Sequence, residues 1–271
     1  VYKRQVKDLI KKYAHIFYED EDGELPAANL PEHEIRLDTE KPIRVPFRQI
    51  PMTLKGEAEK LVKKMMDLDI IEPSNSPYHS PAFLIRRGSK YKIVVDYRAL
   101  NRHVLRKFQP LPTIDSVTSV WHNCNLWSTL DLHHAYFQLN LKKESRPATA
   151  CSIPGVAFWQ FKRVPLGIAS AVGYFQSQIE ATLLGIKNLK CVAYMDDIAT
   201  GSDTFENMYS NLDQIFERLS NVGLMLKPEK TKLLRTELIY LGYKLSQKGL
   251  EISPCLLYTC PSPRDRSISR M

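Results

Sequence analysis

Apolar residues recur with the period of an amphipathic helix in several stretches of the chain. The clearest stripe consists of Met208, Leu212, Ile215, Phe216 and Leu219. The predicted helices cover residues 6–19, 54–69, 111–121 and 169–185, and a last helix follows a cap at Ser202 or Asp203 and ends at Gly223. We expect the apolar stripe of each helix to face a common core.

Strand-like apolar runs lie between these helices. The first runs are 82–97, which surrounds a basic turn, a run that ends at Asp131, and a run at 137–141. The later ones are short strands within 147–164, the hairpin 191–201, and strands within 224–252. Strands, helices and a hairpin follow one another in an order that places helices on one side of an antiparallel sheet. The sequence therefore predicts an α+β fold.

Three acidic residues lie at the ends of predicted strands. Asp196 and Asp197 are adjacent at the tip of the apolar hairpin, and Asp131 ends an earlier strand. Neighbouring carboxylates repel one another, and a hard cation such as Mg²⁺ is the usual reason for placing them together. The residues alone leave an alternative to cation binding open for each site. Asp196 and Asp197 could form a solvated turn, and Asp131 could be a helix cap or turn residue.

A wider pattern surrounds these acids. Tyr194-Met195-Asp196-Asp197, about sixty residues after the segment 130–138 (LDLHHAYFQ), resembles a reverse transcriptase. Further phrases follow in the same order: 76–81 (SPYHSP), 94–101 (VVDYRALN), 164–167 (VPLG) with 175–176 (FQ), 223–224 (GL) with 228–230 (PEK), and 240–243 (YLGY). The resemblance covers 6–254 and favours the Gypsy-like LTR retrotransposons through 70–74 (IIEPS), 96–101 (DYRALN) and 110–115 (PLPTID).

This resemblance implies the fingers and palm of a right-hand polymerase. It divides the chain into a leader at 6–52, mainly fingers at 53–125, and mainly palm with further fingers segments at 126–254. The implied activity is RNA-directed DNA synthesis, in which a dNTP is joined to a primer 3′-hydroxyl on an RNA or DNA template. It also implies adjacent RNase H, integrase and protease regions in a longer polyprotein, and a cytoplasmic location within virus-like particles.

The resemblance also assigns roles to single residues. Asp131, Asp196 and Asp197, with Leu132, would hold two Mg²⁺ ions, or Mn²⁺ in their place. The dNTP would contact Arg87, Lys92, Ala135, Tyr136, Leu166 and Gly167. Primer and template would contact Tyr78, Arg98, Gln176, Tyr194, Met195, Leu241, Gly242 and Tyr243. Lys230, or else Lys227, could protonate the leaving pyrophosphate.

Several of these residues also have an ordinary structural interpretation. The Tyr136 ring is expected to exclude a ribose 2′-hydroxyl, but it could equally be a core aromatic. Arg87 could belong to a solvated hairpin tip, and Lys230 to the solvated surface. His133 and His134 are expected to be turn or surface residues rather than metal ligands. Two alternatives to the function also stay open: a polymerase copying RNA into RNA, and a relic or structural subunit without activity.

Composition adds only broad limits. The 271 residues carry a net charge of +8, which suits a polyanionic partner, and no run of eighteen apolar residues suggests a membrane span. The five cysteines lack the spacing of a metal site and are expected to be reduced. Residues 1–5 and 255–259 can be encoded by nearly complementary inverted sequences, so residues 1–5 and 255–271 are expected to derive from library adaptors. They hold five basic residues and one acidic residue, so the charge without them would be +4.

Overall fold

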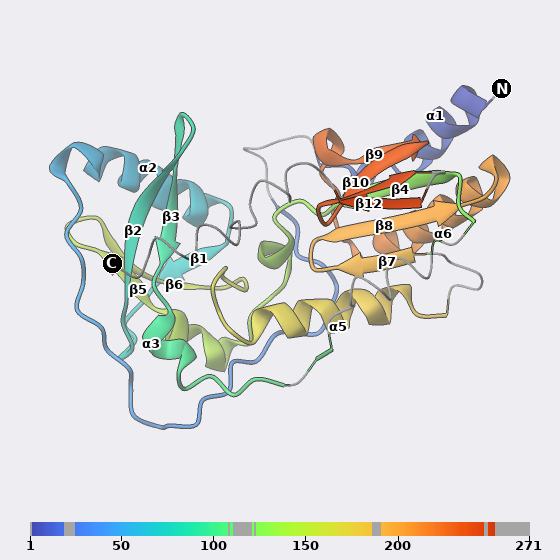
Figure 1. Ribbon diagram of the computed structural model, residues 1–271. Helices are drawn as coiled ribbons and strands as arrows, with labels where there is room; N and C mark the ends of the chain where they lie inside the picture. The colour runs from blue at the N-terminus through green and yellow to red at the C-terminus, as the bar shows by residue number, and fades with distance from the viewer. Residues whose placement is uncertain are drawn as a thin grey trace, which may run out of the picture.

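The computed structural model describes residues 2–18, 25–107, 109–110, 121, 123–185, 191–246 and 249–252. Within these residues the strands form three sheets, in the orders β1-β6-β5-β2-β3, β7-β8-β4-β9 and β10-β11-β12. Figure 1 shows the first sheet in one half of the molecule and the other two in the second half. We call the first the fingers sheet and the second the palm sheet.

The palm sheet is antiparallel throughout, as predicted. Its strands are β4 (Leu126–Asp131), β7 (Cys191–Tyr194), β8 (Asp197–Ser202) and β9 (Lys232–Arg235). The strands β7 and β8 form the predicted hairpin and place it against β4. This arrangement brings the ends of β4 and β8 to the same edge of the sheet.

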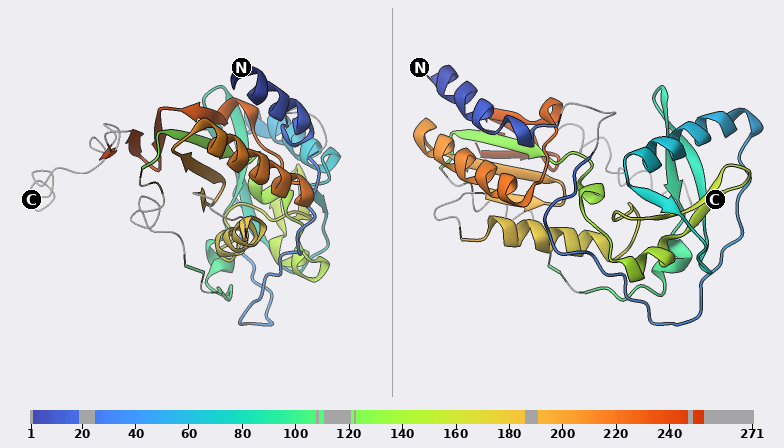
Figure 2. Two further views of the ribbon diagram at one scale, coloured as in Figure 1. Left: turned by 90° about the vertical axis from the view of Figure 1, so that its right-hand side faces the viewer. Right: turned by 180° about the vertical axis from the view of Figure 1, so that it is seen from behind.

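Helices cover one face of the palm sheet. They are α1 (Tyr2–Lys12), α5 (Ala171–Leu183) and α6 (Phe205–Val222), and the view from behind in Figure 2 shows α1 and α6 over the strands. The predicted stripe of α6, from Met208 to Leu219, is fully buried in the largest core cluster. The prediction of helices packed on one side is confirmed.

The two ends of α6 differ in how well the sequence predicted them. Gly223 ends the helix as expected, in the left-handed region with φ of 70°. The predicted caps at Ser202 or Asp203 are wrong, because Thr204 is the N-cap and its hydroxyl accepts a hydrogen bond from Asn207 N. The Asp203 carboxylate instead accepts from the Asn207 side-chain amide.

The opposite face of the palm sheet is covered by strands. These are β10 (Glu237–Tyr240), β11 (Tyr243–Ser246) and β12 (Gly249–Ile252), which pair antiparallel. Trp127 and Ala199 from the palm sheet lie in one core cluster with residues of β10 and β11. The palm sheet is therefore buried on both faces near the acidic edge.

The fingers sheet is made of segments from two separate parts of the chain. Its strands are β1 (Ile71–Pro73), β2 (Ser80–Arg87), β3 (Lys90–Val95), β5 (Cys151–Ile153) and β6 (Ala157–Phe161). The pairing of β2 with β5 is parallel and the other pairings are antiparallel, so this sheet is mixed. The later strands β5 and β6 thus return to the sheet that β1, β2 and β3 began, while the expected division of the chain at 53–125 and 126–254 stays a prediction.

Helix α2 (Lys55–Asp67), which follows the 3₁₀ turn Met52–Leu54, covers one face of the fingers sheet. Its buried residues Ala58 and Val62 share a core cluster with Ala82 of β2. Side chains alternate between the faces of a strand, so Arg87 and Lys92 lie on the face of the sheet opposite α2. The predicted basic hairpin is confirmed as the β2–β3 hairpin.

Two other segments differ from the sequence prediction. The predicted strand at 137–141 is wrong, because the 3₁₀ helix Ala135–Gln138 occupies its first half. The buried Gln138 amide donates to the carbonyl oxygens of His133 and Met225 and accepts from Met225 N, which fixes a turn there. The first helix spans Tyr2–Lys12 rather than 6–19, with a 3₁₀ turn at Ala14–Ile16.

The remaining short elements are α3 (Arg98–Asn101) and 3₁₀ helices at Lys143–Thr149 and Pro228–Lys230. The predicted helix at 111–121 lies outside the described residues except for Trp121. The adaptor hypothesis for the two ends stays a prediction. No helix in the described ranges combines the length and the apolar character that crossing a membrane requires.

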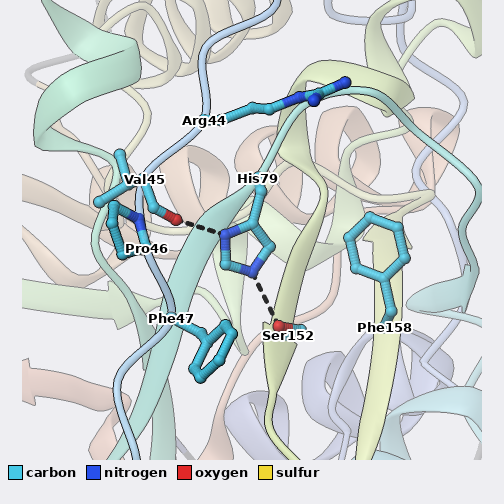
Figure 3. A pocket seen from close by; sticks show the side chains of 7 residues that line it. All are labelled: Arg44, Val45, Pro46, Phe47, His79, Ser152 and Phe158. Carbon is cyan, nitrogen blue, oxygen red and sulfur yellow. Dashed lines mark hydrogen bonds between the residues drawn. The ribbon is translucent and has the colours of Figure 1, made fainter.

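The extended leader is fastened to the fingers through His79. Figure 3 shows the hydrogen bonds that join its ring to the Val45 carbonyl and the Ser152 hydroxyl. Nδ1 donates to the carbonyl across 2.6 Å, so in the neutral ring Nε2 accepts from the hydroxyl across 2.7 Å. The three bonded residues help to line an open groove of about 490 Å³. Its other lining residues are Arg44, Pro46, Phe47 and Phe158. None of these residues is a predicted site residue.

Candidate active site

The three predicted acids meet at one edge of the palm sheet. In the register of β4 and β8, Asp131 lies directly opposite Asp197, and Asp196 occupies the turn between β7 and β8. Leu132 N donates to the Asp196 carbonyl at 3.0 Å, which joins that turn to the end of β4. Opposed residues in an antiparallel pair have neighbouring side chains, so the fold concentrates negative charge here.

Burial and charge repulsion both disfavour ionisation of Asp197. Burial, the larger cause, and the charges of Asp196 and Asp131 together raise the pKa of Asp197 to about 6. A hydrogen bond to Asp131 raises the pKa of Lys230, whose Nζ lies 2.8 Å from Asp131 Oδ2. The folded chain therefore stabilises cations at this edge and disfavours a full set of ionised acids.

We expect Asp197→Asn to stabilise the metal-free protein at neutral pH. The folded-state pKa near 6 exceeds the ordinary value of 3.8, so ionisation costs stability as the pH rises through 6. The variant should gain about 1 kcal/mol at pH 7.5, allowing for solvent screening, or roughly 2–4 °C in Tm. Calorimetry in EDTA should show this gain shrinking toward pH 4.5.

Asp213→Asn serves as the control for that experiment. Asp213 forms an ion pair with Lys12 at 2.7 Å, so its loss removes an attraction and should lower Tm at pH 7.5. A fall in Tm for Asp197→Asn as well would show that repulsion at the acidic edge is not the dominant effect.

Asp131 and Asp196, but not Asp197, border an open cleft of about 370 Å³ between the palm and the β2–β3 hairpin. Its lining consists of Arg87, Lys92, Asp131, Leu132, His133, His134, Ala135, Tyr136, Phe137, Leu166, Asp196, Lys227 and Lys230. Both predicted phosphate contacts, Arg87 and Lys92, thus share one cavity with Asp131 and Asp196. Phe137 and the two histidines belong to the lining although no ligand role was predicted for them.

The floor of the cleft is apolar. Tyr136 is half-buried and its ring lies against Phe175, with a centroid separation of 5.3 Å. Burial and the neighbouring Asp196 charge raise the pKa of the Tyr136 phenol, so its hydroxyl lies in the field of the acids. Leu166 is 61% exposed and contributes apolar surface at the rim.

Asn101 supports the loop that carries Leu166 and Gly167. Its side-chain amide donates to the Gly167 carbonyl at 2.7 Å and its oxygen accepts from Ala169 N at 2.8 Å. Gly167 has φ of +97°, a conformation that side-chain-bearing residues rarely adopt. Asn101 was not predicted as a site residue, and its place in the segment 96–101 was the one available signal.

Gln176 lies beside the acidic turn, but its side chain is buried. Its side chain is completely buried and donates to the Ala193 carbonyl while accepting from Met195 N, at 2.8 and 2.9 Å. Met195 has φ of +53°, so this side chain fixes a strained turn beside Asp196. We therefore replace the expected primer contact by a positioning role, since burial leaves no surface for nucleic acid.

We expect Gln176→Leu to lower the free energy of unfolding by about 2–3 kcal/mol. The substitution leaves the polar groups of Ala193 and Met195 without their partner. Urea titration followed by tryptophan fluorescence would measure the change. The control Gln178→Leu, two residues along α5 and half-buried, should change stability by less than about 0.5 kcal/mol. If both substitutions lowered the free energy of unfolding equally, the positioning role of Gln176 would be refuted.

Comparison with known proteins identifies the family. Residues 85–245 match the family described as "Reverse transcriptase (RNA-dependent DNA polymerase)". This chain belongs to the reverse transcriptase family. The resemblance inferred from the motifs is thereby confirmed.

The relatives are parts of larger polyproteins. The chain is 31% identical over 227 residues to the "Retrovirus-related Pol polyprotein from transposon opus" of Drosophila melanogaster, covering 82% of this chain and 22% of the relative. It is 34% identical over 235 residues to the "Enzymatic polyprotein" of Cestrum yellow leaf curling virus, covering 82% and 36%. The chain thus spans about a fifth to a third of these relatives.

The fold is shared with a solved reverse transcriptase. The foamy viral protease-reverse transcriptase, determined in complex with an RNA/DNA hybrid, superposes with a TM-score of 0.85 at 21% identity. The match covers 99% of this chain and 37% of the viral chain. The predicted α+β arrangement of fingers and palm is confirmed.

The remaining predicted primer and template residues of this reverse transcriptase chain lie outside the residues that line the cleft. Leu241 and Gly242 form the β10–β11 turn with positive φ, and Tyr240 OH donates to the Asp197 carbonyl at 3.3 Å. This bond ties the predicted primer grip to the acidic hairpin. Tyr243 begins β11 and is half-buried.

Arg98 and Tyr78 lie in the fingers, and Tyr194 and Met195 in the palm hairpin. The Arg98 guanidinium is 78% exposed and donates two hydrogen bonds to Asp96, at 2.8 and 2.7 Å. This pairing holds the pKa of Asp96 at about 2. Tyr78 and Tyr194 are half-buried. Direct contacts of these residues with nucleic acid stay predictions.

The acidic edge suits a metal ion that arrives with substrate. Among the described residues, no group of three or more His, Cys, Asp or Glu side chains forms a ready-made metal site. The Asp131 carboxylate is engaged by Lys230, although its oxygens and those of Asp196 and Asp197 are the hard donors that Mg²⁺ prefers. Mg²⁺ commonly binds through one or two carboxylates together with substrate phosphates. The donor set therefore fits Mg²⁺.

Proposed function

We propose that this chain is the nucleotidyl-transfer part of a retroelement polyprotein and acts as an RNA-directed DNA polymerase. The observation that carries the proposal is the cleft in which Asp131 and Asp196 face Arg87 and Lys92. Carboxylates bind the cations that accompany a nucleoside triphosphate, and basic side chains bind its phosphates. A template with a primer and dNTPs are the substrates that suit this pairing.

Several residues of the cleft have a place in the reaction. Asp131, Asp196, Asp197 and the Leu132 carbonyl would hold two Mg²⁺ ions, or Mn²⁺, which neutralise the attacking and leaving oxygens when bound. Arg87 and Lys92 hold the triphosphate, and Tyr136 and Leu166 form an apolar floor for the sugar and base. The primer 3′-oxygen bonds to the α-phosphorus as the bond to the β-phosphate oxygen breaks.

Proton movement completes the reaction. The primer hydroxyl loses its proton to solvent as it attacks, and the leaving pyrophosphate gains a proton. Lys230 and Lys227 both line the cleft, so either ammonium group can deliver that proton. The ammonium of Lys230 lies nearest to the acids because of its bond to Asp131.

The related proteins indicate which molecules this chain would bind. The foamy viral enzyme was determined with an RNA/DNA hybrid, and the retrotransposon relatives are Pol polyproteins. We propose a primed RNA or DNA template as the partner of this chain. Adjacent protease, RNase H and integrase regions, and a location in virus-like particles, are the further expectations of the same resemblance.

Primer extension tests the proposal. The chain is incubated with a DNA primer on an RNA template, four dNTPs and Mg²⁺, and products are resolved by length. We expect template-directed extension that EDTA abolishes. The absence of extension on RNA and DNA templates, with either Mg²⁺ or Mn²⁺, would contradict the proposal. Extension with rNTPs as efficiently as with dNTPs would favour an RNA polymerase.

A further inference from the structure

Lys230 forms an ion pair with Asp131, one of the carboxylates proposed to bind metal. It ends the 3₁₀ helix Pro228–Lys230, and its Nζ lies 2.8 Å from Asp131 Oδ2. The two side chains come from positions 99 residues apart, so the contact is created by the tertiary fold. The Asp131 side chain is only 13% exposed, whereas the Lys230 side chain is 59% exposed.

The charges around this pair are unequal. Asp131, Asp196 and Asp197 together carry three negative charges when ionised, and Lys230 feels all three of them. The neighbouring Lys227 is engaged elsewhere, with its Nζ 3.5 Å from the Glu229 carboxylate. Lys230 is thus the cation that most directly offsets the acids in the folded chain described here.

We propose that Lys230 acts as a resident counter-ion of the acidic edge, which a metal ion must displace from Asp131 before the site is loaded. The inference rests on the proposed function, because it concerns the ions that the same acids would hold. It assigns Lys230 a positioning role that precedes any proton transfer. A largely exposed lysine on a flexible four-carbon stem can leave one partner for another without rearrangement of the backbone.

Displacement also gives Lys230 a new partner. The ammonium group already lines the cleft that holds Arg87 and Lys92, so a triphosphate bound there lies within its reach. Release of Lys230 from Asp131 is then favoured by nucleotide and opposed in its absence. The acids therefore bind metal weakly in the empty enzyme and more tightly once a nucleotide is present, which couples the two binding events.

Metal binding without nucleotide tests this role independently of catalysis. Mn²⁺ is titrated into the nucleotide-free chain and the free ion is counted by electron paramagnetic resonance. We expect Lys230→Met to bind Mn²⁺ about fivefold more tightly than the parent chain, because the metal no longer competes with an ammonium group. Lys230→Arg should retain weak binding. Lys232→Met, on β9 and outside the cleft lining, should match the parent chain.

A second measurement separates competition from a general change in charge. Adding dNTP should tighten Mn²⁺ binding more in the parent chain than in Lys230→Met. Only the parent chain has a lysine that can move from Asp131 to the dNTP phosphates. Unchanged or weaker Mn²⁺ affinity in Lys230→Met, while primer extension by the parent chain is intact, would overturn this inference alone. If neither protein binds Mn²⁺ nor extends a primer, the proposed function fails as well.

Discussion

Asp196→Asn should reduce the rate of primer extension by at least about three orders of magnitude. Asp196 occupies the turn of the palm hairpin, and its carboxylate lines the cleft that also holds Asp131. Replacing it with an amide removes one negative charge from a site proposed to hold two dications. Single-turnover extension with saturating dNTP would measure the loss in the chemical step, and DNA binding should change little.

Two comparisons make this result specific. Glu229→Gln removes a carboxylate that is 78% exposed and bonded to Lys227, so it should keep extension within about twofold of the parent rate. The Tm of Asp196→Asn should not fall, since the lost charge was repelled by its neighbours. Extension by Asp196→Asn at a rate near that of the parent chain would refute the catalytic assignment of the acidic edge.

Tyr136→Ala should raise the ratio of rNTP to dNTP incorporation by about 100-fold. One side of the Tyr136 ring packs on Phe175, and the residue lines the cleft five positions after Asp131. A planar ring in this place would leave no room for a ribose 2′-hydroxyl. The measurement is kcat/KM for matched rNTP and dNTP on one primed template.

Tyr136→Phe provides the matched control, because it keeps the ring and removes only the hydroxyl near Asp196. Its rNTP to dNTP ratio should stay within about threefold of the parent value. If Tyr136→Ala lowers both kcat/KM values equally and leaves their ratio unchanged, the ring is ordinary core packing against Phe175. The preference for DNA synthesis would then need another source.

The contrast between Asp196 and Gln176 shows how far motif reasoning extends. Both were expected at the site from the resemblance, and the structure brings Asp196 into the cleft. Gln176 lies beside it but is fully buried, with its amide bonded to the backbone of β7 and the following turn. A motif predicts that two residues share a region, whereas burial decides whether a side chain meets the ligand or supports the residue that does.

The sequence by itself determined the features that depend on local periodicity and turn chemistry. These include α2, α5 and α6, the β2–β3 and β7–β8 hairpins, and the end of α6 at Gly223. Helical spacing and strand alternation are read within a few residues, and a hairpin register follows from its turn. The family also followed from motif order.

Only the tertiary structure decided which groups satisfy one another across long sequence separations. The 3₁₀ helix at Ala135–Gln138 replaces a predicted strand because the Gln138 side chain bonds to Met225, 87 residues away. Lys230 reaches Asp131 in the same way, which no local pattern encodes. Buried polar groups must find partners wherever the fold places them, so these contacts depend on packing rather than on neighbouring residues.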